Sequence, residues 1–136
     1  MTARDAHWHI LGAGAIGCLH AGRLHSNGCD ITLLMRKGAR QVSLPLIIDC
    51  GGTRREYQVP VATPDHCQPI SQLLVTTKAY DACDAVASVV HLLSEDSTIV
   101  LMVNGMGIAE QLCKDWPHLN LYVGTTTEGA YALAPQ

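Results

Sequence analysis

The sequence predicts an α/β fold, namely a Rossmann-type, doubly wound sheet that is mainly parallel. Three observations predict it. Strand-like and helix-like segments alternate along the 136 residues. Several strand-like segments, such as residues 98–103, are rich in branched apolar side chains, which is typical of parallel strands covered on both faces. A glycine-rich turn, G-A-G-A-I-G, joins the first strand to the first helix. We therefore expect one domain over residues 1–136.

The first βαβ unit follows from the first 35 residues. Residues 7–11 form a short apolar run that predicts a buried strand, and residues 15–25 have the spacing of a helix. Gly28 favours the end of that helix, because glycine tolerates left-handed backbone. Residues 29–35 predict the second strand. The side chains expected on one face of the helix are Ile16, Leu19 and the stem of Arg23.

The middle of the chain predicts a hairpin, with residues 44–49 and 55–61 paired around Gly51 and Gly52. The elements predicted after it are a strand at 73–77, a helix over about 80–93, a strand at 98–103, a helix at 108–115 and a strand at 119–124. The apolar stripe expected on the second helix is Ala82, Val86, Val89 and Leu93. Because the chain ends shortly after a strand, we expect the domain to be incomplete at its C-terminal end.

Composition narrows the classes of function. Hydrophobic residues make up 48% of the chain and charged residues 15%, which predicts a packed core. A net charge of −3 without clustered Lys and Arg argues against a nucleic-acid binder. No apolar run approaches the ~18 residues of a membrane span, and the N-terminus lacks the pattern of a secretory signal. With six scattered cysteines, we expect reduced thiols and a cytoplasmic location.

A metal site is not expected. His7 and His9 would point to the same face of a strand, because side chains alternate along it. A third ligand with suitable spacing is missing from the sequence, so core or edge histidines are the preferred interpretation. Asp81 and Asp84 are predicted to lie on a helix face with no obvious partner.

The glycine loop predicts a site for the pyrophosphate of a dinucleotide. Gly12 would make the tight turn, Gly14 would let phosphates approach the backbone, and Gly17 would let the helix pack on the strand. The helix N-terminus supplies free N–H groups and the positive end of a dipole. The residues assigned to this contact are Gly12, Ala13, Gly14, Ala15, Ile16 and Gly17. The alternative is a turn in an unrelated α/β domain.

Arg36 predicts which dinucleotide would bind. It lies 19 positions after Gly17, where a unit that binds NAD usually carries Asp or Glu for the ribose 2′-hydroxyl. A carboxylate there would repel a 2′-phosphate, whereas a guanidinium can hold it with two hydrogen bonds. The cofactor predicted is therefore NADP(H). The alternative is a solvated basic loop formed by Arg36 and Lys37.

With these residues identified, the chain resembles the ketopantoate reductase (2-dehydropantoate 2-reductase) family over nearly its whole length. Four motifs occur in the family's order. Besides the glycine loop they are Leu-Leu-Val-Thr-Thr-Lys-Ala-Tyr at 73–80, Asn-Gly-Met-Gly at 104–107 and Gly-Thr-Thr-Thr-Glu-Gly-Ala at 124–130. Taken singly, Lys78 could be a solvated lysine, Asn104-Gly105 a turn and Thr125 to Thr127 a β-favouring sequence.

The resemblance implies roles for further residues. Lys78 would reach the cofactor ribose or the substrate, Asn104 would lie near the nicotinamide and the substrate, and Ala130 would contact the cofactor through its backbone. The implied reaction is hydride transfer from NADPH to the ketone of a 2-keto acid, ketopantoate to pantoate, in pantothenate biosynthesis. In this family a C-terminal helical domain supplies the catalytic lysine and a glutamate, so no catalytic residue is expected in this chain.

Two expectations follow for the chain taken alone. It is expected to be inactive without the helical domain, and an alternative to the enzyme is a non-catalytic NADP(H)-binding module or truncated relative. An unpaired strand edge and an apolar face where a second domain would pack favour association. We therefore expect a homodimer formed through the exposed edge. The partners predicted are a small-molecule 2-keto acid, no nucleic acid and no membrane.

Overall fold

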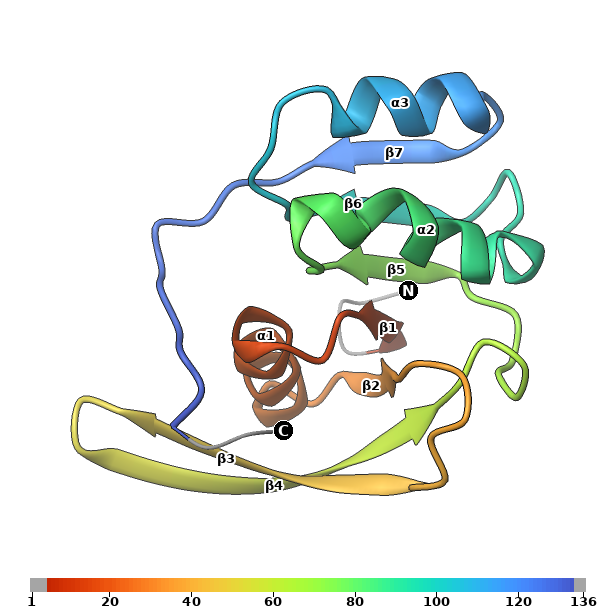
Figure 1. Ribbon diagram of the computed structural model, residues 1–136. Helices are drawn as coiled ribbons and strands as arrows, with labels where there is room; N and C mark the ends of the chain where they lie inside the picture. Colours follow the sequence, from red (N-terminus) through yellow and green to blue (C-terminus); the bar gives the residue numbers. More distant parts are fainter. Residues whose placement is uncertain (1–4, 134–136) are drawn as a thin grey trace.

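The computed structural model describes residues 5–133 and has the predicted α/β architecture. A seven-stranded sheet is flanked by helices (Figure 1). In chain order the elements are β1 (His7–Leu11), α1 (Ala15–Ser26), β2 (Asp30–Leu34), β3 (Ser43–Cys50), β4 (Thr53–Ala62), β5 (Gln72–Val75), α2 (Ala79–Val89), the short 3₁₀ helix η2 (Val90–Leu92), β6 (Thr98–Leu101), α3 (Ile108–Asp115) and β7 (Asn120–Val123). Across residues 5–133, no helix is both long and apolar enough to cross a membrane.

The sheet has the strand order β3-β4-β2-β1-β5-β6-β7. All neighbouring strands are parallel except β3 and β4, which form the predicted antiparallel hairpin. The chain builds outward from β1 through β2 to the hairpin, then returns to the other side of β1 to form β5 and the strands beyond it. Leu11, the last residue of β1, is level with Leu34 of β2 and Val75 of β5. The order therefore reverses beside β1, which is where open α/β sheets bind ligands.

The core has two halves, one on each face of the sheet. Because side chains alternate along a strand, Leu73 and Val75 face α2 and α3, whereas Leu74 faces α1 and the hairpin. The first face is covered by the apolar stripe of α2, in which Ala82, Val86 and Val89 are buried as predicted. Both faces of the central strands are thus covered, which explains why consecutive apolar residues, such as Leu33-Leu34 and Leu73-Leu74-Val75, are buried in them.

Helix α1 packs through small residues rather than through the predicted face. Leu19 is buried as expected, but Ile16 is only half-buried and Arg23 is exposed. The other buried residues of the helix are Gly17, Cys18, Ala21 and Gly22. A Cβ on Gly22 would lie 2.2 Å from Ile48 Cδ1 and 3.2 Å from Tyr57 Cε2, so the hairpin lies directly on this helix. The absence of large side chains on α1 is what allows that approach.

Two strands end two residues earlier than the sequence predicts. β5 ends at Val75 and β6 at Leu101, although strands were expected to reach residues 77 and 103. Thr76 leaves the strand because its side chain serves another purpose: Thr76 Oγ1 donates to the carbonyl oxygens of Gly12, at 2.8 Å, and Leu11, at 3.3 Å. The side chain of Thr76 therefore supports the glycine loop instead of extending the sheet.

Candidate functional site

The glycine loop lies at the carboxyl end of β1 and is packed tightly on its inner side. Gly12 has φ +109°, which other residues rarely adopt, and a Cβ there would lie 2.8 Å from the backbone nitrogen of Thr77. A Cβ on Gly17 would lie 1.9 Å from the Gly12 carbonyl oxygen and 2.7 Å from Thr76 Oγ1. The loop, the first turn of α1 and the end of β5 are therefore fitted to one another without room for a methyl group.

The outer side of the same loop is open. Gly14 caps the N-terminus of α1, is exposed, and would present a Cβ to no heavy atom within 4 Å. The first helical hydrogen bond runs from Cys18 N to Gly14 O at 2.9 Å, so the N–H groups before Cys18 lack acceptors within the helix. The first turn of α1 holds no acidic residue. An anion resting beside Gly14 would meet bare backbone, N–H donors and the positive end of the helix dipole.

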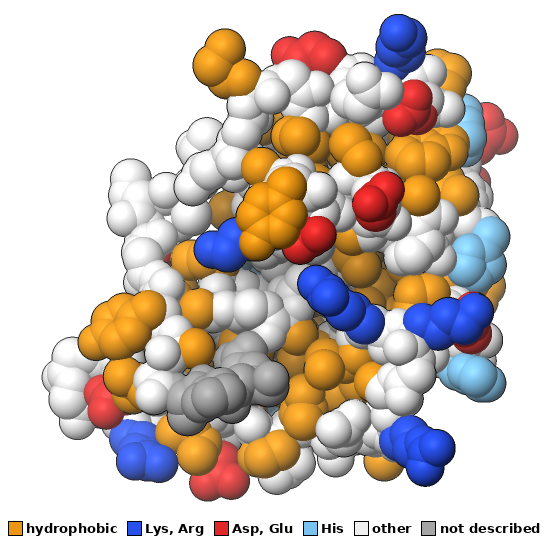
Figure 2. Space-filling model, in the orientation of Figure 1, with side chains coloured by type: hydrophobic (Ala, Val, Ile, Leu, Met, Phe, Trp, Pro, Cys, Tyr) orange, Lys and Arg blue, Asp and Glu red, His pale blue; other side chains and the backbone are white. Residues whose placement is uncertain are grey.

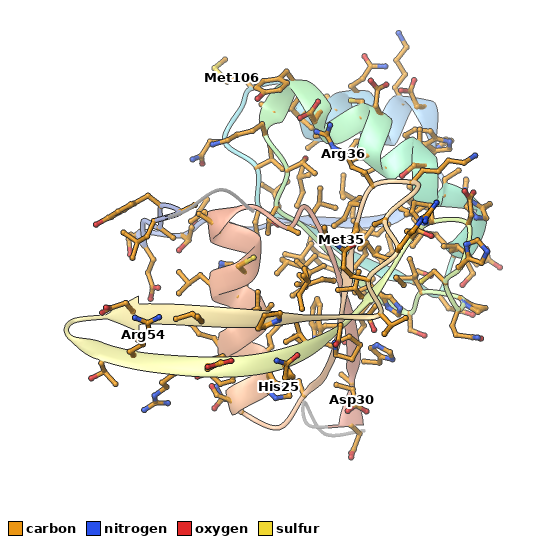
Figure 3. The ribbon with its side chains drawn as sticks, turned by 60° about the horizontal axis from the view of Figure 1, so that its bottom comes forward. His25, Asp30, Met35, Arg36, Arg54 and Met106 are labelled. Carbon is orange, nitrogen blue, oxygen red and sulfur yellow. The ribbon has the colours of Figure 1, made fainter. Side chains whose placement is uncertain are left out.

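Arg36 lies just past β2 at this edge of the sheet. The backbone bond from Met35 N to Ala62 O, at 2.8 Å, fixes the start of the loop that carries it. The Arg36 side chain is 93% exposed, and its Nη2 lies 3.8 Å from Asp81 Oδ2 in the first turn of α2. Figure 3 shows Arg36 beside α2, far from His25 and Asp30 at the other end of the molecule. The expectation that Asp81 has no partner was wrong, because tertiary structure brings α2 next to the loop after β2.

Lys78 and Asn104 come from neighbouring loops at the same edge of the sheet. Lys78 caps the N-terminus of α2 and Asn104 follows β6, and both are exposed. Gly105 allows the two loops to approach closely, because a Cβ there would lie only 2.9 Å from the Cβ of Ala79. The structure thus gives the Asn-Gly pair a packing purpose beside Lys78, in addition to any role of the asparagine.

The segment that carries Ala130 follows β7 and runs past α1 (Figure 1). Ala130 is half-buried, and an ion pair between Arg23 and Glu128 ties this segment to α1. Sequence reasoning singled out neither Glu128 nor Thr76. The signal available for both was their place within the motifs at 124–130 and 73–80, but only the folded chain shows what each one touches.

A pair of histidines lies in the first half of β1. The rings of His7 and His9 stack with centroids 4.4 Å apart, which confirms that they share a face of β1. His7 Nε2 lies 2.8 Å from Thr32 Oγ1. His9 is 3% exposed, and burial, followed by the neighbouring His7, lowers its pKa to about 4. His9 is therefore a neutral core residue near pH 7, and its place is inside β1, before the glycine loop.

Surface charge is mixed around the candidate site. On the face drawn in Figure 2, basic side chains are spread singly among acidic and hydrophobic ones. Beside Arg36, Lys37 Nζ lies 3.4 Å from Asp65 Oδ2. Arg36 and Lys37 are thus each next to a carboxylate, so the positive charge of these two residues is locally balanced.

Comparison with known proteins places this geometry in a family. Residues 8–136 match the family model described as ketopantoate reductase PanE/ApbA. The chain is 30% identical over 121 residues to 2-dehydropantoate 2-reductase of Vibrio cholerae serotype O1, covering 89% of this chain and 39% of that protein.

Solved structures agree on the fold. A ternary complex of D-mandelate dehydrogenase with NADH and anilino(oxo)acetate superposes with a TM-score of 0.83 at 22% identity, covering 96% of this chain and 44% of that one. A 2-dehydropantoate 2-reductase from Methylococcus capsulatus gives a TM-score of 0.76 at 20% identity, with the same coverage. This chain therefore spans less than half the length of these relatives.

Proposed function

The chain belongs to the ketopantoate reductase family, and from this premise we propose that it is the NADP(H)-binding part of a reductase that acts on a 2-keto acid. The observation that carries the proposal is the two-sided glycine loop. Its inner side admits no Cβ at Gly12 or Gly17, while its outer side is open at Gly14. A loop that formed only a turn would not require both close packing on its inner side and exposed backbone N–H groups at a helix N-terminus.

The assignment of the pyrophosphate follows from that loop. Residues 12–17 would hold it through backbone N–H groups of the first turn of α1, with Gly14 allowing close approach. The NADH complex of D-mandelate dehydrogenase supports a nicotinamide dinucleotide in this fold. Ala130 would complete the contact from the segment after β7, which the Arg23–Glu128 pair holds against α1.

Arg36 is proposed to bind the 2′-phosphate and so to select NADP(H). It follows β2 at the carboxyl edge of the sheet, where the adenosine ribose of a bound dinucleotide would lie. The side chain is exposed and its only ion pair in the described chain is a 3.8 Å contact, so it is available to a stronger anion. A phosphate dianion held by two hydrogen bonds from a guanidinium is such an anion.

The substrate would lie beyond the nicotinamide, near Lys78 and Asn104, which follow the neighbouring strands β5 and β6 at the carboxyl edge of the sheet. When bound, the cofactor supplies the hydride that reduces the substrate ketone. Ammonium and amide groups can hold a carboxylate and orient a carbonyl, which is what a 2-keto acid presents. We propose ketopantoate as that acid on the basis of the family, and we assign no catalytic residue within these 136 residues.

Replacement of Arg36 tests the proposal. NADPH and NADH are titrated into the unaltered chain, Arg36→Ala and Arg54→Ala, with binding followed by calorimetry. Loss of a charge-assisted contact costs about 1.5–3 kcal/mol, so Arg36→Ala should weaken NADPH binding roughly 10- to 100-fold and leave NADH binding unchanged. Arg54 lies on the exposed hairpin, away from Arg36 (Figure 3), and its replacement should change neither. Equal weakening of both dinucleotides by Arg36→Ala would contradict the assignment of the 2′-phosphate.

A further inference from the structure

The Arg36–Asp81 ion pair crosses the carboxyl end of the sheet. Arg36 follows β2 and Asp81 belongs to the first turn of α2, which follows β5. β1 lies between those two strands, so the pair reaches from one side of the glycine-loop strand to the other. Within residues 5–133, this is the ion pair that joins the two halves of the sheet at the point where its strand order reverses.

Resting on the proposed function, we propose that Asp81 is a specificity-determining residue for the dinucleotide. Its carboxylate competes with the 2′-phosphate for the guanidinium of Arg36, and so lowers the preference of this chain for NADPH over NADH. A 2′-phosphate can bind Arg36 fully only when the guanidinium turns from Asp81 toward the ribose. NADH carries a hydroxyl at that position and requires no such exchange.

Two further observations support competition rather than a purely structural ion pair. The Arg36 and Asp81 side chains are 93% and 43% exposed, and at 3.8 Å between nitrogen and oxygen the contact is loose. Exposed pairs of this kind contribute little to stability. The adjacent Lys37 is likewise next to Asp65, at 3.4 Å. Arg36 and Lys37 therefore both have carboxylate neighbours, which reduces the positive field that a phosphate dianion would meet.

The charge of Asp81 also acts directly on the phosphate. A phosphate dianion held by Arg36 would still lie near Asp81, because the same guanidinium reaches that carboxylate, and like charges repel even when water screens them. Replacing Asp81 by a neutral residue removes both its competition for Arg36 and its repulsion of the phosphate, and each change favours NADPH binding. Removal of the Asp81 charge should therefore tighten NADPH binding by about three- to tenfold.

The experiment compares Asp81→Asn, Asp81→Ala, Asp81→Glu and Asp84→Asn with the unaltered chain, by calorimetric titration with NADPH and NADH at fixed ionic strength. Asp81→Asn and Asp81→Ala both remove the charge, but only Asn adds a donor that could itself bind phosphate. Asp81→Glu keeps the charge. Asp84, exposed and about one turn further along α2, provides the same charge change away from Arg36. Thermal unfolding of each variant verifies that α2 is intact, since an acidic residue in the first turn also stabilises a helix.

The expected result is tighter NADPH binding in both Asp81→Asn and Asp81→Ala, by about three- to tenfold, with NADH binding unchanged and with Asp81→Glu and Asp84→Asn like the unaltered chain. Unchanged or weaker NADPH binding in the two neutral variants would overturn the inference and would show that Asp81 is neutral to Arg36 or positions it. If the unaltered chain binds NADPH and NADH equally and Arg36→Ala changes nothing, the proposed function fails, and the inference falls with it.

Discussion

Substitution of Gly17 by alanine should disrupt the glycine loop from within. The added Cβ would lie 1.9 Å from the Gly12 carbonyl oxygen and 2.7 Å from Thr76 Oγ1, and real Cβ atoms essentially never come within 3.0 Å of such atoms. The first turn of α1 must therefore retreat by roughly 1 Å from a backbone atom that cannot rotate away. Overpacking of this kind costs about 1–3 kcal/mol, and loss of the Thr76–Gly12 hydrogen bond adds about 1 kcal/mol. We expect the free energy of unfolding to fall by about 2–4 kcal/mol.

Gly14→Ala is the matched control, because it adds the same methyl group on the open side of the same loop. No heavy atom lies within 4 Å of that Cβ, and the backbone there has φ −80°. The smaller entropy of the unfolded chain and the weaker N-cap preference of alanine oppose each other, so stability should change by less than about 1 kcal/mol. NADPH binding should nevertheless weaken at least about tenfold, because the methyl group occupies the approach to the phosphates.

Urea unfolding followed by far-ultraviolet circular dichroism measures the stability of both variants, and calorimetric titration measures NADPH binding. The two variants should therefore differ: Gly17→Ala should lower the free energy of unfolding, and Gly14→Ala should lower only the affinity for NADPH. A Gly17→Ala chain as stable as the unaltered one would refute the packing argument. A Gly14→Ala chain with undiminished NADPH affinity would refute the placement of the phosphates.

Three further predictions concern the rest of the molecule. The pKa of His9 in the folded state is about 4, below its unfolded value, so the free energy of unfolding should be greatest above pH 6.5 and fall by up to about 3 kcal/mol toward pH 4. In His9→Leu, the free energy of unfolding measured with urea should depend less on pH over that range. Gly22→Ala should destabilise the unaltered chain by about 1 kcal/mol, because its Cβ would lie 2.2 Å from Ile48 Cδ1. In an Ile48→Val background, which lacks Cδ1, the same substitution should be stabilising. Additive effects of the two substitutions in a double-mutant cycle would contradict this prediction. β7 is an edge strand that exposes Tyr122 and Val123, so we expect the chain to dimerise as its concentration rises. Tyr122→Lys should prevent this dimerisation. Light scattering that shows only monomer for the unaltered chain would count against this prediction.

Sequence periodicity was sufficient to predict the order of the elements. The predicted succession of strands and helices was confirmed from β1 to β7, as was the hairpin around Gly51 and Gly52. Three members of the predicted α2 stripe, Ala82, Val86 and Val89, were confirmed as buried. Leu93 was not, because α2 ends at Val89 and Leu93, beyond the 3₁₀ helix, is extended and only half-buried. The α1 face was not, because it packs through glycine, alanine and cysteine, and small residues leave no periodic signal of their own.

Contacts between distant segments were beyond the reach of sequence reasoning. Thr76 reads as strand because threonine favours β structure, but a hydrogen bond to Gly12, 64 residues away, draws it out of the sheet. The pairing of Asp81 with Arg36 and of Glu128 with Arg23 likewise depends on which loops the sheet order brings together. The positions of the site residues were predicted by their places after strands, whereas the partners that tune them appear only in the fold.

The central claim is that a dinucleotide binds at the carboxyl ends of β1, β2 and β5. The most direct test is a titration of the ¹⁵N-labelled chain with NADPH, followed by amide chemical shifts. We predict that the largest shifts cluster at residues 12–17 and at Arg36, with smaller ones at Thr77 and Lys78, and that NADH leaves Arg36 nearly unmoved. Shifts centred instead on His7, at the amino end of β1, or no shifts at saturating NADPH, would contradict this claim.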